Sequence, residues 1–428
     1  MKDKLLKIKD KPFIRNVLIL TTGTATAQAV GLVSSPIITR LYGPEAFGIM
    51  GVFMAIAQIF VPVAALTYPI AIVLPRDDQN AKKLMKLSLL VSLGIFILIT
   101  LVLLLFNNGL IELFQIQNVS AYLFLIPLVI LFSGVMQVFE QWLIRTKQFT
   151  VNAKVSFLQS FITNGGKVGF GLFNPVASVL VFLSASANGL KALMMMLYLK
   201  KSKYVSNEIQ NEQLSLMDLA KKYKDFPMYR APEVLINAIS QRFPILMLTT
   251  FFGPVAAGFY TLSNTVLQKP IQLIGNSVGN VFYQRISDAA NNKESLTNLI
   301  KKATISIATV GIVPFGMIIF FGPWIFSFIF GGEWSTAGEY AQWIGLFLFC
   351  EFINKPSVKA LPVLSAQRFH LNFTIIILLI RVSALAVGYY IFSSDILAIA
   401  LFGVSSAILN IGLILLILKR SKIFDNTK

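Results

Sequence analysis

Long apolar runs with few charges recur along the whole chain, and they limit what it can fold into. The run LSLLVSLGIFILITLVLLLF (87–106) contains no charged residue. About 20 apolar residues are what an α-helix needs to cross the hydrocarbon core of a bilayer. Of the 428 residues, 56% are hydrophobic and 13% are charged, whereas roughly 25% are charged in soluble domains. The sequence therefore predicts an all-α polytopic membrane protein.

Hydropathy places twelve spans, six in each half of the chain. They lie near 16–39, 46–74, 84–106, 120–141, 154–174 and 176–199, and then near 231–252, 256–283, 302–330, 338–362, 371–392 and 396–418. We expect an N-terminal six-helix lobe (1–199), a cytoplasmic interfacial linker (200–230) and a C-terminal six-helix lobe (231–428). The linker carries the amphipathic stretch LSLMDLAKKYKDF, which is typical of a helix lying along a membrane surface.

Basic residues predict the orientation of the spans. The N-terminus reads like a signal peptide with ATA as a cleavage site, but its apolar stretch continues to Arg40, which favours an uncleaved first helix. Lys and Arg gather in the N-terminal tail and in alternate connections, whereas the intervening connections hold only Arg40. By the positive-inside rule both termini are cytoplasmic. This pattern accounts for most of the net charge of +18, with the basic loops facing anionic membrane lipids and no nucleic-acid partner.

Two short segments indicate an internal repeat. LYGPEAFGIMG (41–51) and FFGPVAAGFYT (251–261) align without a gap, so that Gly43 matches Gly253 and Pro44 matches Pro254. Each segment joins the first and second spans of a six-span half. Because both halves have six spans, we expect two lobes related by a pseudo-twofold axis along the membrane normal, with transport sites near mid-depth.

Two segments carry a resemblance to a known family. YKDFPMYRAPEVLINAISQRFPILMLTTFFGPVAAGFYTLSNTVLQKPIQLIGNSVGNVFYQRISDA (223–289) and IFSFIFGGEWSTAGEYAQW (325–343) resemble polysaccharide flippases of the Wzx type. The resemblance implies the two-lobed, MATE-like fold of the multidrug/oligosaccharidyl-lipid/polysaccharide (MOP) exporters. Peptidoglycan-precursor flippases of that superfamily typically have fourteen spans, two more than are expected here.

The resemblance also implies a function without enzymatic chemistry. It implies a flippase of the bacterial cytoplasmic (inner) membrane that moves undecaprenyl-pyrophosphate-linked oligosaccharide repeat units to the outer leaflet by alternating access, for O-antigen, capsule or exopolysaccharide synthesis. The lipid-linked glycan would be its cargo, and the polymerase of the same pathway is a candidate partner. No cofactor is expected, since the glycine-rich run around Lys167 lacks the spacing of a nucleotide-binding loop. A single cysteine, Cys350, and a single histidine, His370, in a short polar connection, leave no cluster for a metal.

Charged residues inside the spans are the candidate site. A Lys or Arg at mid-bilayer costs about 2.5–3.5 kcal/mol on insertion scales, so these residues should face a wet cavity or an ionic partner. Lys191 and Lys359 are close enough to span ends to extend to the interface. Two roles stay open for the cations near mid-depth. They could line a cationic cavity between the lobes that binds pyrophosphate, or they could pair with carboxylates across helices. These cations are Lys167, Arg242, Lys269, Lys355 and Arg381.

Glu351 is the one carboxylate expected near mid-depth. It stands four residues before Lys355, so an ion pair within the helix and substrate contact by Lys355 are equally consistent with the spacing. Glu351 is also the candidate for ion coupling. Gln28, Gln58 and Asn264 are candidates for contact with sugar hydroxyls. The glycines around Lys167 suit either a cavity-lining, flexible helix or ordinary helix packing.

Other functions fit less well. A MATE-like drug or organic-cation antiporter is the main alternative, but it needs carboxylates inside, and this chain has the opposite balance. A sugar facilitator is disfavoured because the connection LPRDDQNAKK (74–83) lacks the glycine-and-arginine signature of that superfamily. A membrane polymerase or ligase would carry a large outer loop, and the longest expected here has about 14 residues.

Overall fold

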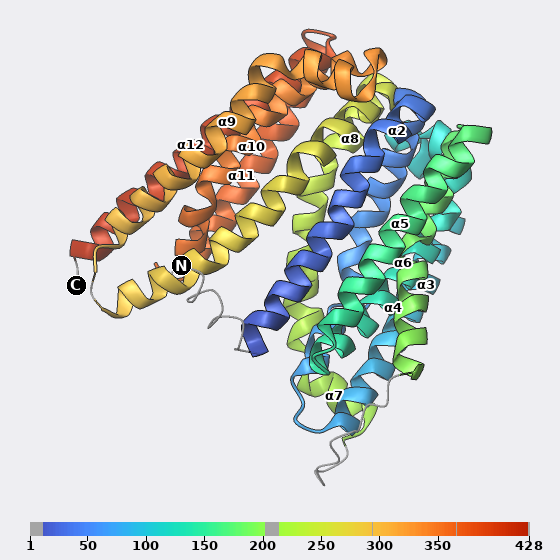
Figure 1. Cartoon of the computed structure of the whole chain (residues 1–428), viewed down its shortest axis with the longest axis vertical. Coiled ribbons are helices and arrows are strands. Elements are labelled where there is room, and N and C mark those ends of the chain that lie inside the picture. Colours follow the sequence, from blue (N-terminus) through green and yellow to red (C-terminus); the bar gives the residue numbers. More distant parts are fainter. Residues whose placement is uncertain (1–11, 202–213, 293, 365, 427–428) are drawn as a thin grey trace. The chain divides into compact units, whose positions relative to one another are not determined.

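The computed structural model describes residues 12–201, 214–292, 294–364 and 366–426. Within these ranges the chain forms helices and no β-strand. The basic N-terminal tail (1–11) and residues 202–213 of the expected linker lie outside the described residues. The helices labelled in Figure 1 are α2 (Pro12–Phe60), α3 (Asp78–Phe114), α4 (Ile126–Arg145), α5 (Phe149–Phe173), α6 (Ala177–Lys201), α7 (Leu216–Lys222), α8 (Ala231–Asn291), α9 (Leu296–Phe330), α10 (Ser335–Ala360), α11 (Gln367–Tyr390) and α12 (Asp395–Asn426).

The helices pack into two compact units, unit 1 (Met1–Thr250) and unit 2 (Phe251–Lys428). In unit 1, α2 packs along α5 and contacts α6, while α4 contacts both α3 and α6. In unit 2, α10 packs against both α9 and α12, and α11 packs on α12 (Figure 1). The division falls inside α8, about 20 residues after the expected boundary at 230/231. The arrangement of two six-helix lobes and a linker therefore stays a prediction.

The aligned repeat segments form the same local structure. Helix α2 is interrupted at Gly43 (φ 67°, ψ 173°) and α8 at Gly253 (φ 81°, ψ −177°). This backbone region is essentially restricted to glycine. The proline that follows each glycine starts the next helix well, since its φ is already helical and its missing N–H is not needed there. The Gly-Pro pairs thus mark the two places where consecutive spans meet without a loop.

The long helices account for twelve spans. Eight segments are long and apolar enough to cross a membrane, and two of them, in α2 and α8, run through the glycine turns and hold two spans each. The remaining two spans are α5 and α10, with 25 and 26 residues. Each is roughly 37–39 Å long, which exceeds the ~30 Å hydrocarbon core. They are the more polar helices, and they carry Lys167, Glu351 and Lys355. The all-α, polytopic fold class is confirmed for the described residues.

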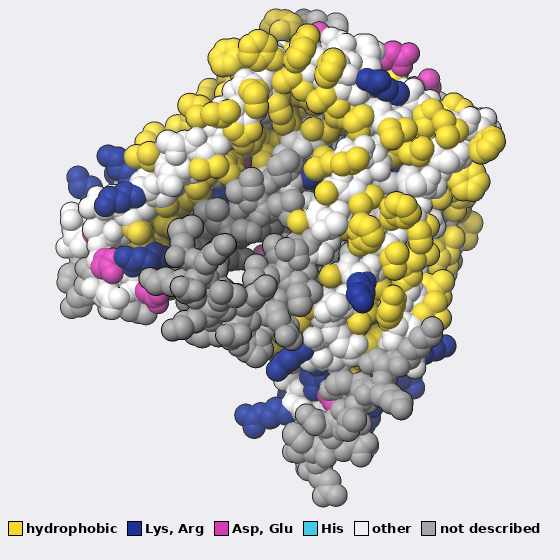
Figure 2. Space-filling view, viewed as in Figure 1, with side chains coloured by type: hydrophobic (Ala, Val, Ile, Leu, Met, Phe, Trp, Pro, Cys, Tyr) yellow, Lys and Arg dark blue, Asp and Glu magenta, His cyan; other side chains and the backbone are white. Residues whose placement is uncertain are grey.

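Large apolar side chains lie on the outer faces of both units. Figure 2 shows hydrophobic side chains over the lengths of the helices and Lys and Arg mainly near helix ends. Helices α3 and α9 have little of their apolar surface buried inside the protein. Soluble monomers rarely expose apolar patches of this extent, so these faces are suited to lipid. Their exposed residues include Leu93, Ile97, Leu104 and Leu105 on α3 and Val310, Val313, Met317 and Phe320 on α9.

Helix α7 lies in the amphipathic stretch predicted from the sequence. Ser215 and Asp218 form a reciprocal capping box at its start, with the Ser215 Oγ accepting from the Asp218 N–H at 3.1 Å. Leu219 is buried in a cluster with Leu84 of α3 and Trp142 of α4, whereas Met217 is exposed. The stretch is therefore a short amphipathic helix docked on unit 1, and its position at a membrane surface stays a prediction.

The chain's single cysteine and single histidine lie in different surroundings. Cys350 is buried on α10. His370 is not in a polar connection as expected, since it lies half-buried in the first turn of α11. Its carbonyl oxygen accepts a hydrogen bond from Thr374, and burial lowers the pKa of its imidazole.

Candidate functional site

Lys167 lies half-buried on α5, facing α2. Its Nζ is 4.0 Å from Met50 Sδ, and its carbonyl oxygen accepts a hydrogen bond from the Tyr42 hydroxyl at 2.7 Å. A Cβ at Gly171 would lie 2.7 Å from the Tyr42 ring, so a side chain there would prevent this approach of α2. Unit 1 thus holds a lysine between two tightly packed spans.

The glycines around Lys167 divide between the two roles considered for them. A Cβ at Gly166 would touch Leu183 of α6 at 3.4 Å, and Gly171 meets α2, so these two serve close helix packing. Gly165 and Gly169 have no neighbour within 4 Å of the Cβ position. Helix packing accounts for one pair, and the Cβ positions of the second pair are open. Residues two apart on a helix do not share a face, so this open space is not on the side of Lys167.

A second cation of unit 1, Arg242, lies on α8 two residues before the buried Pro244. Its side chain is half-buried. Lys191, which was expected to extend to the interface, instead pairs with Glu140 at 3.6 Å. Glu140 also accepts a hydrogen bond from Asn152 at 3.1 Å. Lys191 therefore belongs to a structural ion pair between α6 and α4.

Unit 2 brings three of the predicted charged residues together. Glu351 and Lys355 on α10 form an ion pair at 3.1 Å, in the i, i+4 order that favours attraction along a helix. Glu351 also acts electrostatically on Arg381 of α11. Among the described residues only Lys355 lies within ion-pair distance of Glu351, and the group of three keeps an excess positive charge.

Arg381 is held by aromatic and hydroxyl groups. Its guanidinium carbon lies 5.2 Å from the ring centre of Phe347 and 5.4 Å from that of Phe402, which are cation–π distances. Its Nε donates to Ser406 Oγ at 2.9 Å. These contacts orient one edge of the guanidinium, and the ring faces replace water that the charge would otherwise require.

A buried amide chain extends from this cluster. The Asn410 side chain donates to the Ser406 carbonyl oxygen at 2.9 Å, and Asn354 donates to Asn410 Oδ1 at 3.1 Å. Sequence reasoning missed these residues. The i, i+4 spacing of Ser406 and Asn410, and the position of Asn354 beside Lys355, were the signals available. Within the described part of the chain, Asn354 Oδ1 and Ser357 Oγ are buried with no hydrogen-bond partner.

The remaining candidates have few partners. Lys269 lies half-buried on α8, and no acidic side chain of the described residues is within ion-pair distance of it. Gln28 Oε1 and Asn264 Oδ1 are buried, and no group of the described residues donates a hydrogen bond to either oxygen. A buried polar atom left without a hydrogen bond costs about 1–3 kcal/mol, so water or a ligand would be favoured at both. Gln58 is half-buried on α2.

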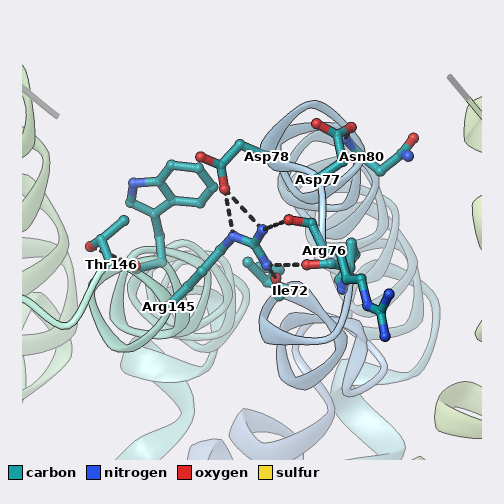
Figure 3. A network of polar contacts seen from close by, with 9 residues as sticks. Ile72, Arg76, Asp77, Asp78, Asn80, Arg145 and Thr146 are labelled. Atoms are coloured by element: carbon teal, nitrogen blue, oxygen red, sulfur yellow. Dashed lines mark hydrogen bonds and ion pairs between the residues drawn. The ribbon is translucent and has the colours of Figure 1, made fainter. Parts of the chain in front are cut away.

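Figure 3 shows a further network at the start of α3 that sequence reasoning missed. The Arg145 guanidinium donates to Asp78 Oδ1 at 2.9 and 3.0 Å. It also donates to the carbonyl oxygens of Ile72, Pro75 and Arg76 at 3.1, 2.7 and 3.4 Å. The Arg145 and Asp78 side chains are only 10% and 3% exposed. The network secures the connection before α3 to the end of α4, so Arg145 is a structural residue here.

Comparisons with known proteins agree with this architecture. The succinoglycan biosynthesis transport protein ExoT of Rhizobium meliloti (strain 1021) is 22% identical over 376 residues, which cover 83% of this chain and 70% of that protein. An inward-facing multidrug resistance MATE family transporter of the MOP superfamily is similar in structure, with a TM-score of 0.75 and 13% identity, over 94% of this chain and 96% of that chain. The lipid II flippase MurJ in an inward closed conformation gives a TM-score of 0.68 at 13% identity, over 96% and 92% of the two chains.

The similarity to solved structures shows a MATE-like fold. Residues 37–339 match the family described as "Polysaccharide biosynthesis protein". That match covers well over half of the chain and agrees with the resemblance to a polysaccharide-export family that the sequence indicated. The chain belongs to this polysaccharide biosynthesis family.

Proposed function

We propose that this protein translocates undecaprenyl-pyrophosphate-linked oligosaccharide units across the bacterial cytoplasmic membrane by alternating access. The observation that carries the proposal is the excess of cations within the spans. Glu351 pairs with Lys355. Among the described residues neither Arg381 nor Lys269 has a carboxylate within ion-pair distance. Phosphate oxygens are the natural partners of such groups, since Lys offers a point charge and Arg a bidentate fork.

The sugar part of the cargo would contact polar side chains that are not cationic. Buried oxygens of Gln28 and Asn264 lack donors among the described residues, and sugar hydroxyls can supply them. Gln58 is a further candidate for such a contact. The lipid tail would remain in contact with hydrocarbon, while the pyrophosphate follows the five cations Lys167, Arg242, Lys269, Lys355 and Arg381.

The membrane potential supports export of an anion. With both termini and the basic connections in the cytoplasm, an anion that leaves a negative interior gains about 2.3 kcal/mol per charge per 100 mV. Glu351 is the candidate for additional ion coupling, because its carboxylate pairs with Lys355 inside a span. We further propose that the polymerase of the same pathway receives the exported unit.

A MATE-like antiporter of organic cations is the alternative, supported by the fold alone. A cationic drug requires an exposed carboxylate in the path. Within the described spans Glu351 is already paired with Lys355 and lies near Arg381. The charge balance therefore favours an anionic cargo, and fold by itself does not choose between the two.

The test is complementation in a bacterial strain that lacks its own flippase. We expect wild type to restore surface polysaccharide, and Arg242→Ala, Lys269→Ala and Arg381→Lys to fail at matched membrane abundance while lipid-linked precursor accumulates. Lys301→Ala, which removes an exposed lysine at the start of α9, is the matched control and should behave as wild type. Normal export by all three variants would refute a cationic path. Failure of wild type together with export of organic cations would support the antiporter.

A further inference from the structure

Unit 2 contains an apolar crevice of about 270 Å³ between α8 and α9, with α10 at its base. Its walls include Leu267 and Ile271 of α8, Val310, Pro314 and Phe315 of α9, and Phe352 of α10. No charged or polar side chain lines it. The volume is slightly below the range of about 300–1,000 Å³ typical of small-molecule sites. It therefore suits a short length of hydrocarbon chain better than a whole ligand.

The crevice is formed by two features of α9. Pro314 lies inside the helix, so it cannot donate to the carbonyl oxygen of Val310 one turn earlier, and helices bend at such positions. A Cβ at Gly311 would lie 3.1 Å from both Phe349 and Phe352, so glycine lets these rings pack closely on α9. Phe315 packs on the same two rings, with ring centres 5.5 and 5.9 Å apart. The base of the crevice is thus aromatic and rigid.

Lysines lie directly beyond one end of the crevice. Lys355 follows the basal Phe352 by three residues on α10, and Lys359 follows one turn later. Both lysine stems lie along glycines of α8, since a Cβ at Gly275 would be 3.5 Å from Lys355 Cε and one at Gly279 would be 3.1 Å from Lys359 Cε. The apolar crevice between α8 and α9 therefore leads toward two lysine side chains that lie between α8 and α10.

This combination selects an amphiphile with an apolar chain and an anionic end. A cationic drug would be repelled by the lysines. A helix of a second chain, about 10 Å in diameter, is too wide for the crevice. Lys355 is already paired with Glu351, so a ligand at the two lysines must compete with that carboxylate. A diphosphate brings at least two negative charges for this purpose, whereas the phosphate of an ordinary phospholipid brings one. Charge complementarity thus favours a lipid diphosphate.

We propose that the crevice binds a segment of the isoprenoid chain of the lipid-linked cargo, with its diphosphate placed at Lys355 and Lys359. This inference rests on the proposed function, and it adds a position for the lipid tail. The chain segment next to the diphosphate fills the space between α8 and α9. The more distant part of the tail lies in the bilayer along the exposed face of α9.

Two valines of α9 offer a matched pair of variants. Val310 lines the crevice and is 62% exposed, whereas Val313 is 63% exposed and lies outside the lining. Val310→Phe would occupy the crevice, and Val313→Phe adds the same ring to the lipid-facing surface. Because both side chains are exposed, neither substitution disturbs a packed core, and thermal unfolding of both variants should match wild type.

The experiment is photolabelling of the full-length protein in lipid nanodiscs. The probe is a prenyl diphosphate with a diazirine in its second isoprene unit, and labelled peptides are located by mass spectrometry. We expect label on α8 and α9 around Leu267 and Val310, displaced by undecaprenyl diphosphate but not by phosphatidylglycerol. Val310→Phe should reduce it about tenfold, the loss expected when roughly two buried CH₂ groups are excluded. Val313→Phe should leave it unchanged.

Three results would overturn the inference: label elsewhere in the chain, equal displacement by phosphatidylglycerol, or equal labelling of the two variants. The first excludes the site, the second makes it a general lipid site, and the third shows that the crevice is not occupied. Complementation by wild type tests the proposed function separately. If wild type restores polysaccharide and Val310→Phe does so equally well, the tail site fails while the flippase stands.

Discussion

At the scale of single residues, the charges inside the spans differ in how they are compensated. Arg381 is surrounded by two aromatic rings and a serine hydroxyl, whereas Lys355 is paired with Glu351. The groups in contact with the Arg381 guanidinium are neutral, so they orient the side chain without cancelling its positive charge. A cation held in this way can still attract phosphate oxygens.

The Ser406 hydroxyl should matter for stability. Ser406→Ala leaves the Arg381 Nε–H without its acceptor in a buried setting, and we expect a loss of about 1–3 kcal/mol in the free energy of unfolding. Ser405→Ala is the matched control, because that hydroxyl bonds only the Phe402 carbonyl oxygen of its own helix. Thermal unfolding in detergent measures both. Equal melting temperatures would mean that the Arg381–Ser406 bond contributes nothing.

The connection between α8 and α9 should contribute a pH-dependent term. The hydrogen bond from Arg285 lowers the pKa of the Glu294 carboxyl. Since its folded pKa lies below its unfolded value of about 4.3, this pair stabilises the folded state above that pH, and the contribution disappears as the pH falls through the folded pKa.

We therefore expect Arg285→Gln to be slightly less stable than wild type at pH 7 and equally stable near pH 3. The effect should shrink with added salt, because both side chains are exposed. The measurement is the melting temperature of both proteins at the two pH values, with and without about 0.5 M salt. That salt concentration shortens the electrostatic screening length on the order of fourfold relative to low salt. A difference that persists unchanged at acidic pH would assign another role to Arg285.

At the scale of elements, the Gly-Pro turns are the best-defined feature. Sequence alignment alone paired Gly43 with Gly253, and their backbone angles agree closely. The reason is local: a glycine-only conformation followed by proline ends one helix and begins another with no tertiary information. By contrast, the polar chain through Asn354, Ser406 and Asn410 depends on how α10 and α12 are rotated about their axes, and no local rule supplies that rotation.

Gly43→Ala and Gly253→Ala should each be destabilising by about 1–3 kcal/mol, the usual cost of forcing a side chain into that backbone region. Gly94→Ala in α3 is the control. Its Cβ position has no neighbour within 4 Å, so alanine there should be neutral or slightly stabilising. Melting temperatures of the three variants test the repeat directly. A neutral effect at Gly43 or Gly253 would show that the turn can be rebuilt without glycine.

At the scale of the whole molecule, the number of spans and the sidedness are separate questions. Twelve spans follow from lengths and hydropathy, and the helices of the described residues are long enough to provide them. Sidedness rests on the distribution of Lys and Arg, because a polypeptide structure alone contains no membrane. It therefore needs its own measurement.

Cys350 makes that measurement simple. Since it is the only cysteine and is buried, Cys350→Ala gives a background in which single cysteines can be placed. We expect Asn118→Cys, in the exposed connection after α3, to react with a membrane-impermeant maleimide in intact cells. Asn292→Cys, exposed between α8 and α9, should react only after lysis. The reverse pattern would invert the topology and place both termini outside.

The sequence by itself determined the membrane class, the number of spans, the repeat and the helices that carry charge, because long apolar runs, Gly-Pro pairs and isolated Lys or Arg are local signals. Tertiary structure decided which charges meet across helices: Lys191 with Glu140, and Arg145 with the connection before α3. It also decided where the packing leaves a crevice, between α8 and α9. These outcomes depend on the rotation and spacing of neighbouring helices, which are set by side-chain packing over many residues at once.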